Sequence, residues 1–257
     1  MAYIYIHLDT ISNSVLSKGL SIADFALSVP EKPQNILLLD PNAVEGEFES
    51  HTGLKMIRGQ GPVEDYYNSH AAKREIETKW IDFRDIHFLQ QLTPMEIAEL
   101  LYFSHMATQL HSPFFYKLQN NFVYFEKKDT LAKVFYRHLD DFYEIVAEKV
   151  RSKVYQKINE RKSFFKAATP VASMEANLMK EFRSVFQEGV VLDFNQQELR
   201  DQLYSIPVYV VEDQVKTIDN RKFRQEDRIA LITYDLTAKT WSVQQDEWDA
   251  LPNLKQV

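Results

Sequence analysis

The sequence predicts an α+β protein, in which antiparallel strands from both termini and a central hairpin pack with a helical middle of about three main helices. Three observations lead to this prediction. Segments near both ends of the chain alternate apolar and polar residues or form short β-branched runs, as strands do. Residues 122–136 contain two aromatic runs around a polar turn. The segments that flank this hairpin repeat apolar residues every three or four positions, as helices do.

Length and composition bound the class of protein. The chain has 257 residues, a formal net charge of −7 and no cysteine. The absence of cysteine excludes disulfides, thiolate nucleophiles, iron–sulfur clusters and cysteine-bound zinc, and it fits a reducing compartment. The N-terminus lacks the basic flank of a signal peptide, and the longest aliphatic run, residues 36–39, is far shorter than the about 20 residues of a membrane span. We therefore expect a soluble, cytoplasmic protein without membrane insertion.

Residues 1–90 form a first sub-region, which we expect to be rich in strands and loops. Residues 2–8 alternate isoleucine or leucine with tyrosine or histidine, which predicts a strand with one buried face. The remaining elements expected here are a short helix within residues 11–29, a buried strand at residues 36–39, and a helix followed by a short strand within residues 71–90.

Residues 41–70 are compositionally distinct, because four of the six glycines of the chain fall there with two prolines. We find no regular periodicity in this stretch, which predicts a long loop. Two interpretations stay open. The stretch is an ordinary surface loop, or it is a ligand-binding loop on which His51, Lys55 and Arg58 meet an anionic ligand.

Residues 91–188 form the helical middle. Thr93 and Glu96 match a capping box around Pro94, which predicts a helix start, and an apolar stripe continues to His111. Two aromatic runs then predict the hairpin 122–136, although a helix beginning at Thr130 is an alternative. The second and third helices are expected at residues 139–162 and 173–187, and Gly189 would end the third.

Residues 189–257 form a strand-rich C-terminal sub-region. Strands are predicted at residues 190–194, 207–211, 229–234 and 240–243, and the last two would form a hairpin. An acidic, amphipathic tail follows from Asp246. Because no linker rich in Pro, Gly or Ser interrupts the second half, we expect residues 1–257 to be a single co-folded unit.

Three histidines are the best candidates for catalysis: His105, His111 and His138, with Asp140 and Asp141 beside the last. Their spacing does not favour a shared site, because His105 and His111 are six positions apart on a helix. The simpler interpretation gives His111 a favourable position at a helix C-terminus and makes Asp140 or Asp141 a helix cap. No metal site and no cofactor are predicted.

The segment 149–166 carries the most distinctive charge pattern, with seven basic residues against Glu160 alone. Lysine and arginine recur at four-residue spacing along the predicted helix. The candidate binding residues are Lys149, Lys153, Lys157, Arg161 and Lys162, to which Arg58 is added from the glycine-rich stretch. A solvated or self-neutralised face, an acidic protein partner or second copy of the chain, and a nucleic-acid backbone are the three interpretations.

The residues from Phe88 through the Thr93-Pro94 helix start, and from His111-Ser-Pro-Phe-Phe-Tyr to Lys133-Val-Phe-Tyr-Arg, resemble a family of uncharacterised soluble proteins of low-GC Gram-positive bacteria. Some members of that family carry an oxalate/formate antiporter label. The resemblance covers about residues 88–165 and implies no catalytic residues. We reject the transporter label for this chain, because no segment is long and apolar enough to span a bilayer.

For function, the sequence favours a cytosolic, non-catalytic binding or interaction protein that uses the basic helical face. Its partner would be a second copy of the chain or an acidic protein, and nucleic acid is a further alternative. The competing hypothesis is a small-molecule enzyme with a histidine-containing cleft between the glycine-rich stretch and the helical middle.

Overall fold

The computed structural model describes residues 3–72, 77–103, 115–127, 131–160, 167–211, 223 and 227–245. Contacts divide the chain into two compact units: an N-terminal unit, Leu8–Ile145, and a C-terminal unit, Met1–His7 with Val146–Val257. Helices and strands each make up 34% of the described residues, which confirms the mixed class. The expectation of about three main helices is wrong, because the described residues contain eight helices and thirteen strands.

The N-terminal unit contains an antiparallel sheet with the strand order β2-β8-β7-β6-β3-β5-β4. The strands of this sheet are β2 (Ser14–Lys18), β3 (Asn35–Leu38), β4 (Glu47–Glu49), β5 (Leu54–Arg58), β6 (Thr78–Asp82), β7 (Phe122–Lys127) and β8 (Leu131–Tyr136). The helices of the unit are α1 (Ile22–Ser28), α2 (Gln60–Ala72), α3 (Ile86–Gln90), α4 (Pro94–Phe103), α5 (Phe115–Leu118) and the start of α6 (Leu139–Asn159).

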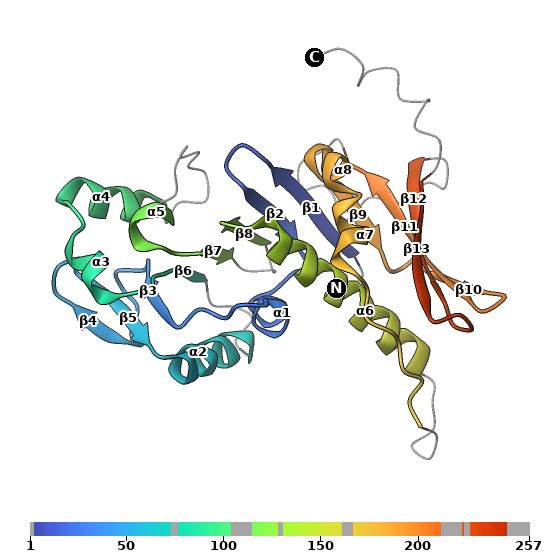
Figure 1. The fold of residues 1–257 in the computed structure, drawn as a ribbon, viewed down its shortest axis with the longest axis horizontal. Coiled ribbons are helices and arrows are strands. Elements are labelled where there is room, and N and C mark those ends of the chain that lie inside the picture. The colour runs from blue at the N-terminus through green and yellow to red at the C-terminus, as the bar shows by residue number, and fades with distance from the viewer. Residues whose placement is uncertain are drawn as a thin grey trace, which may run out of the picture. The chain divides into compact units, whose positions relative to one another are not determined.

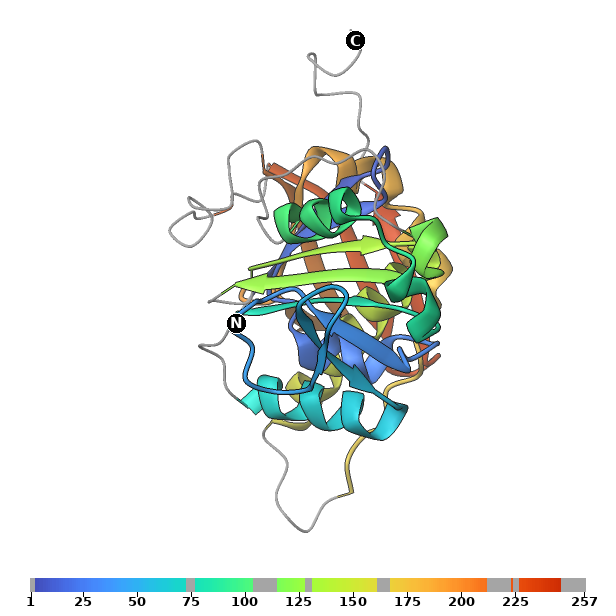
Figure 2. The ribbon, with the colours of Figure 1, turned by 90° about the vertical axis from the view of Figure 1, so that its left-hand side faces the viewer.

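Helices cover both faces of this sheet. Figures 1 and 2 show α1 and α2 on one side of the strands and α4 and α5 on the other. On the α1–α2 side, the ring centroid of Phe25 lies 5.5 Å from that of Trp80 and 5.3 Å from that of Tyr124. The rings of Trp80 and Tyr124 stack on each other with centroids 5.2 Å apart. On the other side, Ile81 and Phe125 belong to the apolar core that includes residues of α3, α4 and α5. Burial on both faces explains why β3 and β7 are almost continuously apolar.

Sequence signals placed several elements of the N-terminal unit correctly. The Thr93 backbone N–H donates to Glu96 Oε2 at 2.8 Å, and the Glu96 N–H donates to Thr93 Oγ1 at 3.4 Å, so the capping box is present. The predicted hairpin is confirmed, because β7 and β8 pair antiparallel from Phe122 opposite Tyr136 to Lys127 opposite Leu131.

Other expectations for this unit are corrected. Residues 41–70 are not a long loop, because they contain β4, β5 and most of α2. The short helix expected within residues 11–29 is confirmed as α1, although the strand β2 precedes it, and the short strand expected within residues 71–90 is confirmed as β6. Helix α4 is described only to Phe103, so its predicted continuation to His111 lies outside the described residues.

The C-terminal unit contains the strand order β13-β12-β11-β9-β1, with β10 beside β11. These strands are β1 (Tyr3–Asp9), β9 (Val190–Asp193), β10 (Glu198–Arg200), β11 (Leu203–Val210), β12 (Arg228–Asp235) and β13 (Thr240–Gln245). The helices are the rest of α6, α7 (Ala176–Lys180) and α8 (Arg183–Glu188). The third helix predicted at residues 173–187 is therefore two short helices.

Two features fix the chain path in the C-terminal unit. Gly189 ends α8 with φ +84°, and a Cβ at this position would lie 3.1 Å from the Tyr5 hydroxyl, so only glycine suits the turn into β9. The backbone of Ala172 makes two hydrogen bonds to aromatic side chains. The Trp241 Nε1–H donates to the Ala172 carbonyl oxygen at 3.0 Å, and the Ala172 N–H donates to the Tyr234 hydroxyl at 3.1 Å. The predicted hairpin of the last two strands is confirmed.

None of the helices in the described part of the chain is long and apolar enough to cross a bilayer.

Candidate functional site

A pocket of about 430 Å³ lies within the N-terminal unit, between the strands β4 and β5 and the helix α2. We call it the β4–β5–α2 pocket. Its polar lining consists of Glu45, Glu47, Arg58, Asp65, Tyr66 and Ser69. Met56, Ile57 and Pro62 supply its apolar lining. A volume of this size is within the usual range for small-molecule sites.

Helix α2 forms one wall of the pocket. Gly59 has φ +93°, a conformation that favours glycine, and Pro62 in the first turn loses no helical hydrogen bond. The helix then buries Val63, Tyr66, Tyr67 and His70, which follow helical spacing. Because this face is buried against the unit, Asp65 and Ser69 are left to line the pocket.

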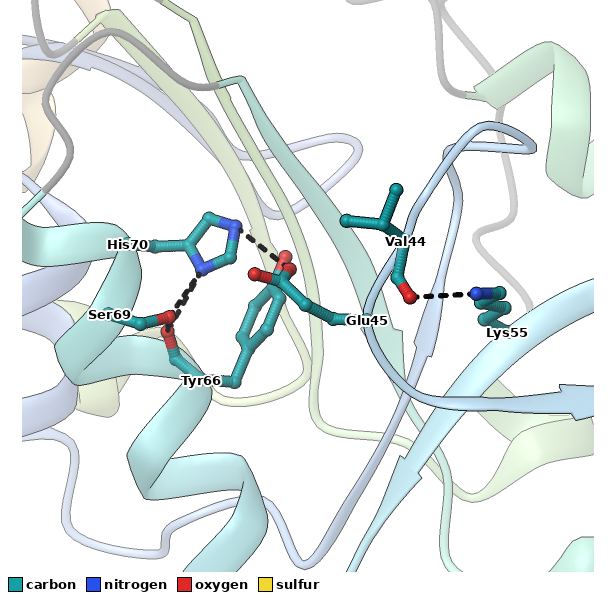
Figure 3. Close-up of polar contacts among 6 residues, drawn as sticks. All are labelled: Val44, Glu45, Lys55, Tyr66, Ser69 and His70. Atoms are coloured by element: carbon teal, nitrogen blue, oxygen red, sulfur yellow. Dashed lines mark hydrogen bonds and ion pairs between the residues drawn. The ribbon is translucent and has the colours of Figure 1, made fainter.

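The opposite wall depends on a close backbone approach at Gly46. Gly46 has φ +86°, and a Cβ there would lie 2.7 Å from the Met56 carbonyl oxygen. The segment before β4 is held further by Lys55, whose Nζ donates to the Val44 carbonyl at 2.8 Å (Figure 3). These two contacts fix the positions of Glu45 and Glu47, which flank Gly46 in the sequence.

Glu45 meets the imidazole of His70, which is buried on α2 (Figure 3). His70 Nε2 lies 3.5 Å from Glu45 Oε2, and His70 Nδ1 lies 3.0 Å from the Tyr66 carbonyl oxygen and 3.1 Å from Ser69 Oγ. A carbonyl only accepts, so Nδ1 carries a proton. Nε2 is then the ring nitrogen that faces the Glu45 carboxylate.

Tyr66 lines the pocket beside this pair. Its side chain is buried, and its ring centroid lies 4.0 Å from that of His70. Burial, followed by the charges of Glu45 and Asp40, raises the pKa of Tyr66, so its hydroxyl keeps its proton. Among the described residues, this hydroxyl has no hydrogen-bond partner. An unpartnered hydroxyl in a pocket wall is free to bind a ligand.

Arg58 is the predicted binding residue that lines the pocket. Its guanidinium pairs with Glu47 at 2.6 Å, so its charge is already balanced. The other two residues of the predicted anion-binding set lie elsewhere. His51 Nε2 is 2.7 Å from the Leu92 carbonyl oxygen, and the Lys55 ammonium is bonded to the loop backbone. The three side chains do not converge.

The candidate catalytic histidines do not form a described cluster. His105 and His111 lie outside the described residues, and His138 is exposed next to α6. Burial raises the pKa of the neighbouring Asp141. No group of three or more His, Asp or Glu side chains among the described residues could hold a metal ion.

The basic face of α6 is partly neutralised by residues close to it in the sequence. Lys157 pairs with Glu160 at 2.9 Å, and Lys149 and Lys153 are half-buried, each with an interaction partner of its own. The predicted continuation of the face, Arg161 and Lys162, lies outside the described residues. Beside these lysines on α6, Val146, Val150 and Val154 follow four-residue spacing and are fully buried.

A second pocket, of about 460 Å³, lies in the C-terminal unit beside β10, β11 and β12. Arg200, Arg228 and Gln197 line it, and Gln197 Oε1 is buried without a hydrogen bond to any residue that the structure describes. Tyr209, also in its wall, stacks at 4.8 Å on Phe223, which borders segments outside the described residues. We assign no site there.

Sequence reasoning did not find Glu45, Asp65 or Tyr66. A signal for the α2 wall was present in the apolar and aromatic residues at positions 63, 66, 67 and 70, which follow one helix face. No comparable signal exists for Glu45, because its role depends on the pairing of β4 with β5 and on their approach to α2.

No protein-family model, curated protein or solved structure matches this chain. The functional argument therefore rests on the geometry of the site.

Proposed function

We propose that the protein is a non-catalytic binding protein that holds a small ligand in the β4–β5–α2 pocket. The observation that carries the proposal is the buried Tyr66, which lines a pocket of about 430 Å³ with a hydroxyl that has no partner among the described residues. Small-molecule sites combine apolar walls with a few polar groups in this way. The function expected from sequence is kept, but its site moves from the basic helix to this pocket.

The polar groups of the pocket support binding rather than catalysis. Ser69, His70 and Glu45 lie in the order of a hydrolytic triad, with Ser69 Oγ 3.1 Å from His70 Nδ1. That nitrogen donates to the Tyr66 carbonyl, so it has no lone pair to take the serine proton. The Ser69 hydroxyl itself donates to the same carbonyl at 2.9 Å. Neither group is activated for nucleophilic attack.

A blocking substitution tests the proposal. Asp65 is exposed on α2 at the pocket, whereas Asn68 is exposed on the same helix and does not line it. We expect compounds from a diverse small-molecule library to raise the Tm of the wild type and of Asn68→Trp, but not of Asp65→Trp. Hits that act equally on Asp65→Trp, or a library without hits, would contradict the proposal. Circular dichroism of both variants checks their folding.

A second candidate function is binding of an acidic protein or a nucleic acid by the α6 face. One observation favours it: Val146, Val150 and Val154 bury one face of α6, while Lys149, Lys153 and Lys157 follow the adjacent face at four-residue spacing. Fluorescence anisotropy of labelled DNA and RNA oligomers at roughly 50 and 200 mM salt tests the nucleic-acid branch, because counterion release makes phosphate binding fall steeply with salt. Absence of binding at the lower salt would remove that branch.

A further inference from the structure

We infer that the protein forms a symmetric dimer in which the edge strand β13 of one copy pairs antiparallel with β13 of a second copy. This inference is independent of the β4–β5–α2 pocket, because β13 belongs to the C-terminal unit. The chemistry of the contact is that of the backbone, since the peptide N–H and C=O groups at the edge of a sheet are satisfied by another extended strand.

The strand β13 lies at the end of the strand order. It pairs with β12 and with no other strand among the described residues. The pairing is regular over all six residues, from Ala230 opposite Gln245 to Asp235 opposite Thr240, without a shift of register. A regular edge of this length is a template for a further strand.

The hydrogen-bond pattern shows which residues of β13 face this edge. The Leu236 N–H donates to the Gln202 carbonyl at 2.9 Å, on the β11 side of β12, so the preceding residue Asp235 directs its backbone groups toward β13. Asp235 lies opposite Thr240, and the direction alternates along each strand. The residues whose backbone groups point away from β12 are therefore Trp241, Val243 and Gln245.

The sequence of β13 lacks the features that protect sheet edges from association. Its six residues, Thr-Trp-Ser-Val-Gln-Gln, include no charged residue and no proline. The edge strands β4 and β10 differ, because each has only three residues, of which two are charged. We therefore expect association at β13 rather than at β4 or β10.

The side chains of β13 suit a second copy of the same strand. A two-fold axis at Val243 places Val243 opposite its own counterpart and Trp241 opposite Gln245, so all facing pairs within the strand are uncharged. Trp241 and Val243 share one face of the strand, and both are half-buried. A second strand beside them removes more of their apolar surface from water, which stabilises the dimer.

The charges at the two ends of the strand are also complementary. Lys239 precedes β13 and is exposed, and the sequence continues after β13 with Asp246 and Glu247. An antiparallel pair brings the beginning of each strand to the end of the other. The two-fold arrangement therefore brings unlike charges together at both ends, which favours a second copy over a partner of unmatched charge.

The test is the molar mass in solution, measured by light scattering after size exclusion across a wide range of protein concentration. We expect the wild type to have twice the mass of one chain at high concentration. Val243→Lys should have the mass of one chain, because two ammonium groups would face each other across the axis. Val243→Thr is the matched control, which keeps the β-branched shape and the backbone N–H and should remain dimeric.

A proline provides a second way to block the edge. Val243→Pro removes the N–H at the axis, and because this N–H points away from β12, an edge strand tolerates the change. We expect this variant to have the mass of one chain with an unchanged circular dichroism spectrum. If it does not fold, the comparison of Val243→Lys with Val243→Thr decides the question.

Amide hydrogen exchange at Val243 identifies what covers the edge. Exchange should slow as the dimer forms. A wild type with the mass of one chain at every concentration would overturn the inference, whether this amide exchanges fast, as at an open edge, or slowly, as under another part of the same chain. A dimer that persists in Val243→Lys would use another surface and would overturn it equally.

Discussion

At the residue scale, Asp82 is the buried acid with the clearest structural task. It is 6% exposed, and its carboxylate accepts the backbone N–H of Phe122 at 2.6 Å and that of Asn121 at 2.9 Å. These bonds hold the turn before β7 against the end of β6. Burial raises the pKa of Asp82 to about 7, although these backbone bonds favour the charged form.

This pKa predicts how stability depends on pH. An aspartate in an unfolded chain has a pKa of about 3.9, so the folded protein binds more protons at Asp82 between about pH 4 and pH 7. Asp82 therefore lowers the free energy of unfolding as pH rises through this window, by up to about 4 kcal/mol, and has no further effect above it. Urea unfolding between pH 4.5 and 8 should show this decline.

The matched variant is Asp82→Asn, which keeps an acceptor oxygen for the turn but cannot ionise. Its free energy of unfolding should fall less than that of the wild type over the same pH range. Equal slopes for the two proteins would show that Asp82 titrates normally and that another group sets the pH dependence.

At the element scale, the sequence predicts those helices whose signals are local. Thr93 and Glu96 define the start of α4 because a capping box needs only a four-residue segment. Phe142, Val146, Val150 and Val154, apolar residues at four-residue spacing, likewise predict α6. Helix α2 was missed because Gly59, Gly61 and Pro62 read as loop residues, whereas the structure uses them to start a helix.

The candidate site likewise contains one residue with a local sequence signal and others that depend on the fold. Arg58 could be proposed from its own charge, and it lines the pocket. The Glu47 carboxylate that balances it, and the Tyr66 hydroxyl, become part of one site only when β4, β5 and α2 meet in three dimensions. That meeting depends on contacts such as the approach of Gly46 to the Met56 carbonyl, for which sequence spacing gives no signal.

Also at this scale, reversal of charge on α6 separates a binding face from a structural one. The double variant Lys153→Glu/Lys157→Glu breaks the ion pair of Lys157 with Glu160 and adds acidic groups to the helix. Exposed pairs contribute about 0–1 kcal/mol, so we expect little change in Tm while any anionic partner binds more weakly. A large loss of Tm would identify the stripe as structural and remove the second candidate function.

At the scale of the whole molecule, the division into two units falls inside α6, between Ile145 and Val146. A helix propagates cooperatively, because each added residue extends an existing hydrogen-bonded ladder. We therefore expect both units to unfold in a single transition, in agreement with the co-folded unit predicted from sequence.

The unfolding of each unit can be followed by its own tryptophan, because Trp80 belongs to the N-terminal unit and Trp241 to the C-terminal unit. In a Trp248→Phe background, the additional variants Trp80→Phe and Trp241→Phe each leave one reporter. In each variant, urea transitions by fluorescence and by circular dichroism should coincide. Separate midpoints for the two probes within one variant would instead show that the units unfold independently.

The stacked rings around Trp80 have an optical consequence. Trp80 has no solvent exposure, its indole N–H has no hydrogen-bond partner in the described part of the chain, and the ring centroid of Tyr67 of α2 lies 5.4 Å from its own. Its emission should therefore appear at the short wavelengths of an indole in a hydrocarbon-like medium. Since the neighbouring Tyr66 lines the pocket, a ligand that shifts α2 would change this emission, and the protein would signal its own occupancy without an attached dye.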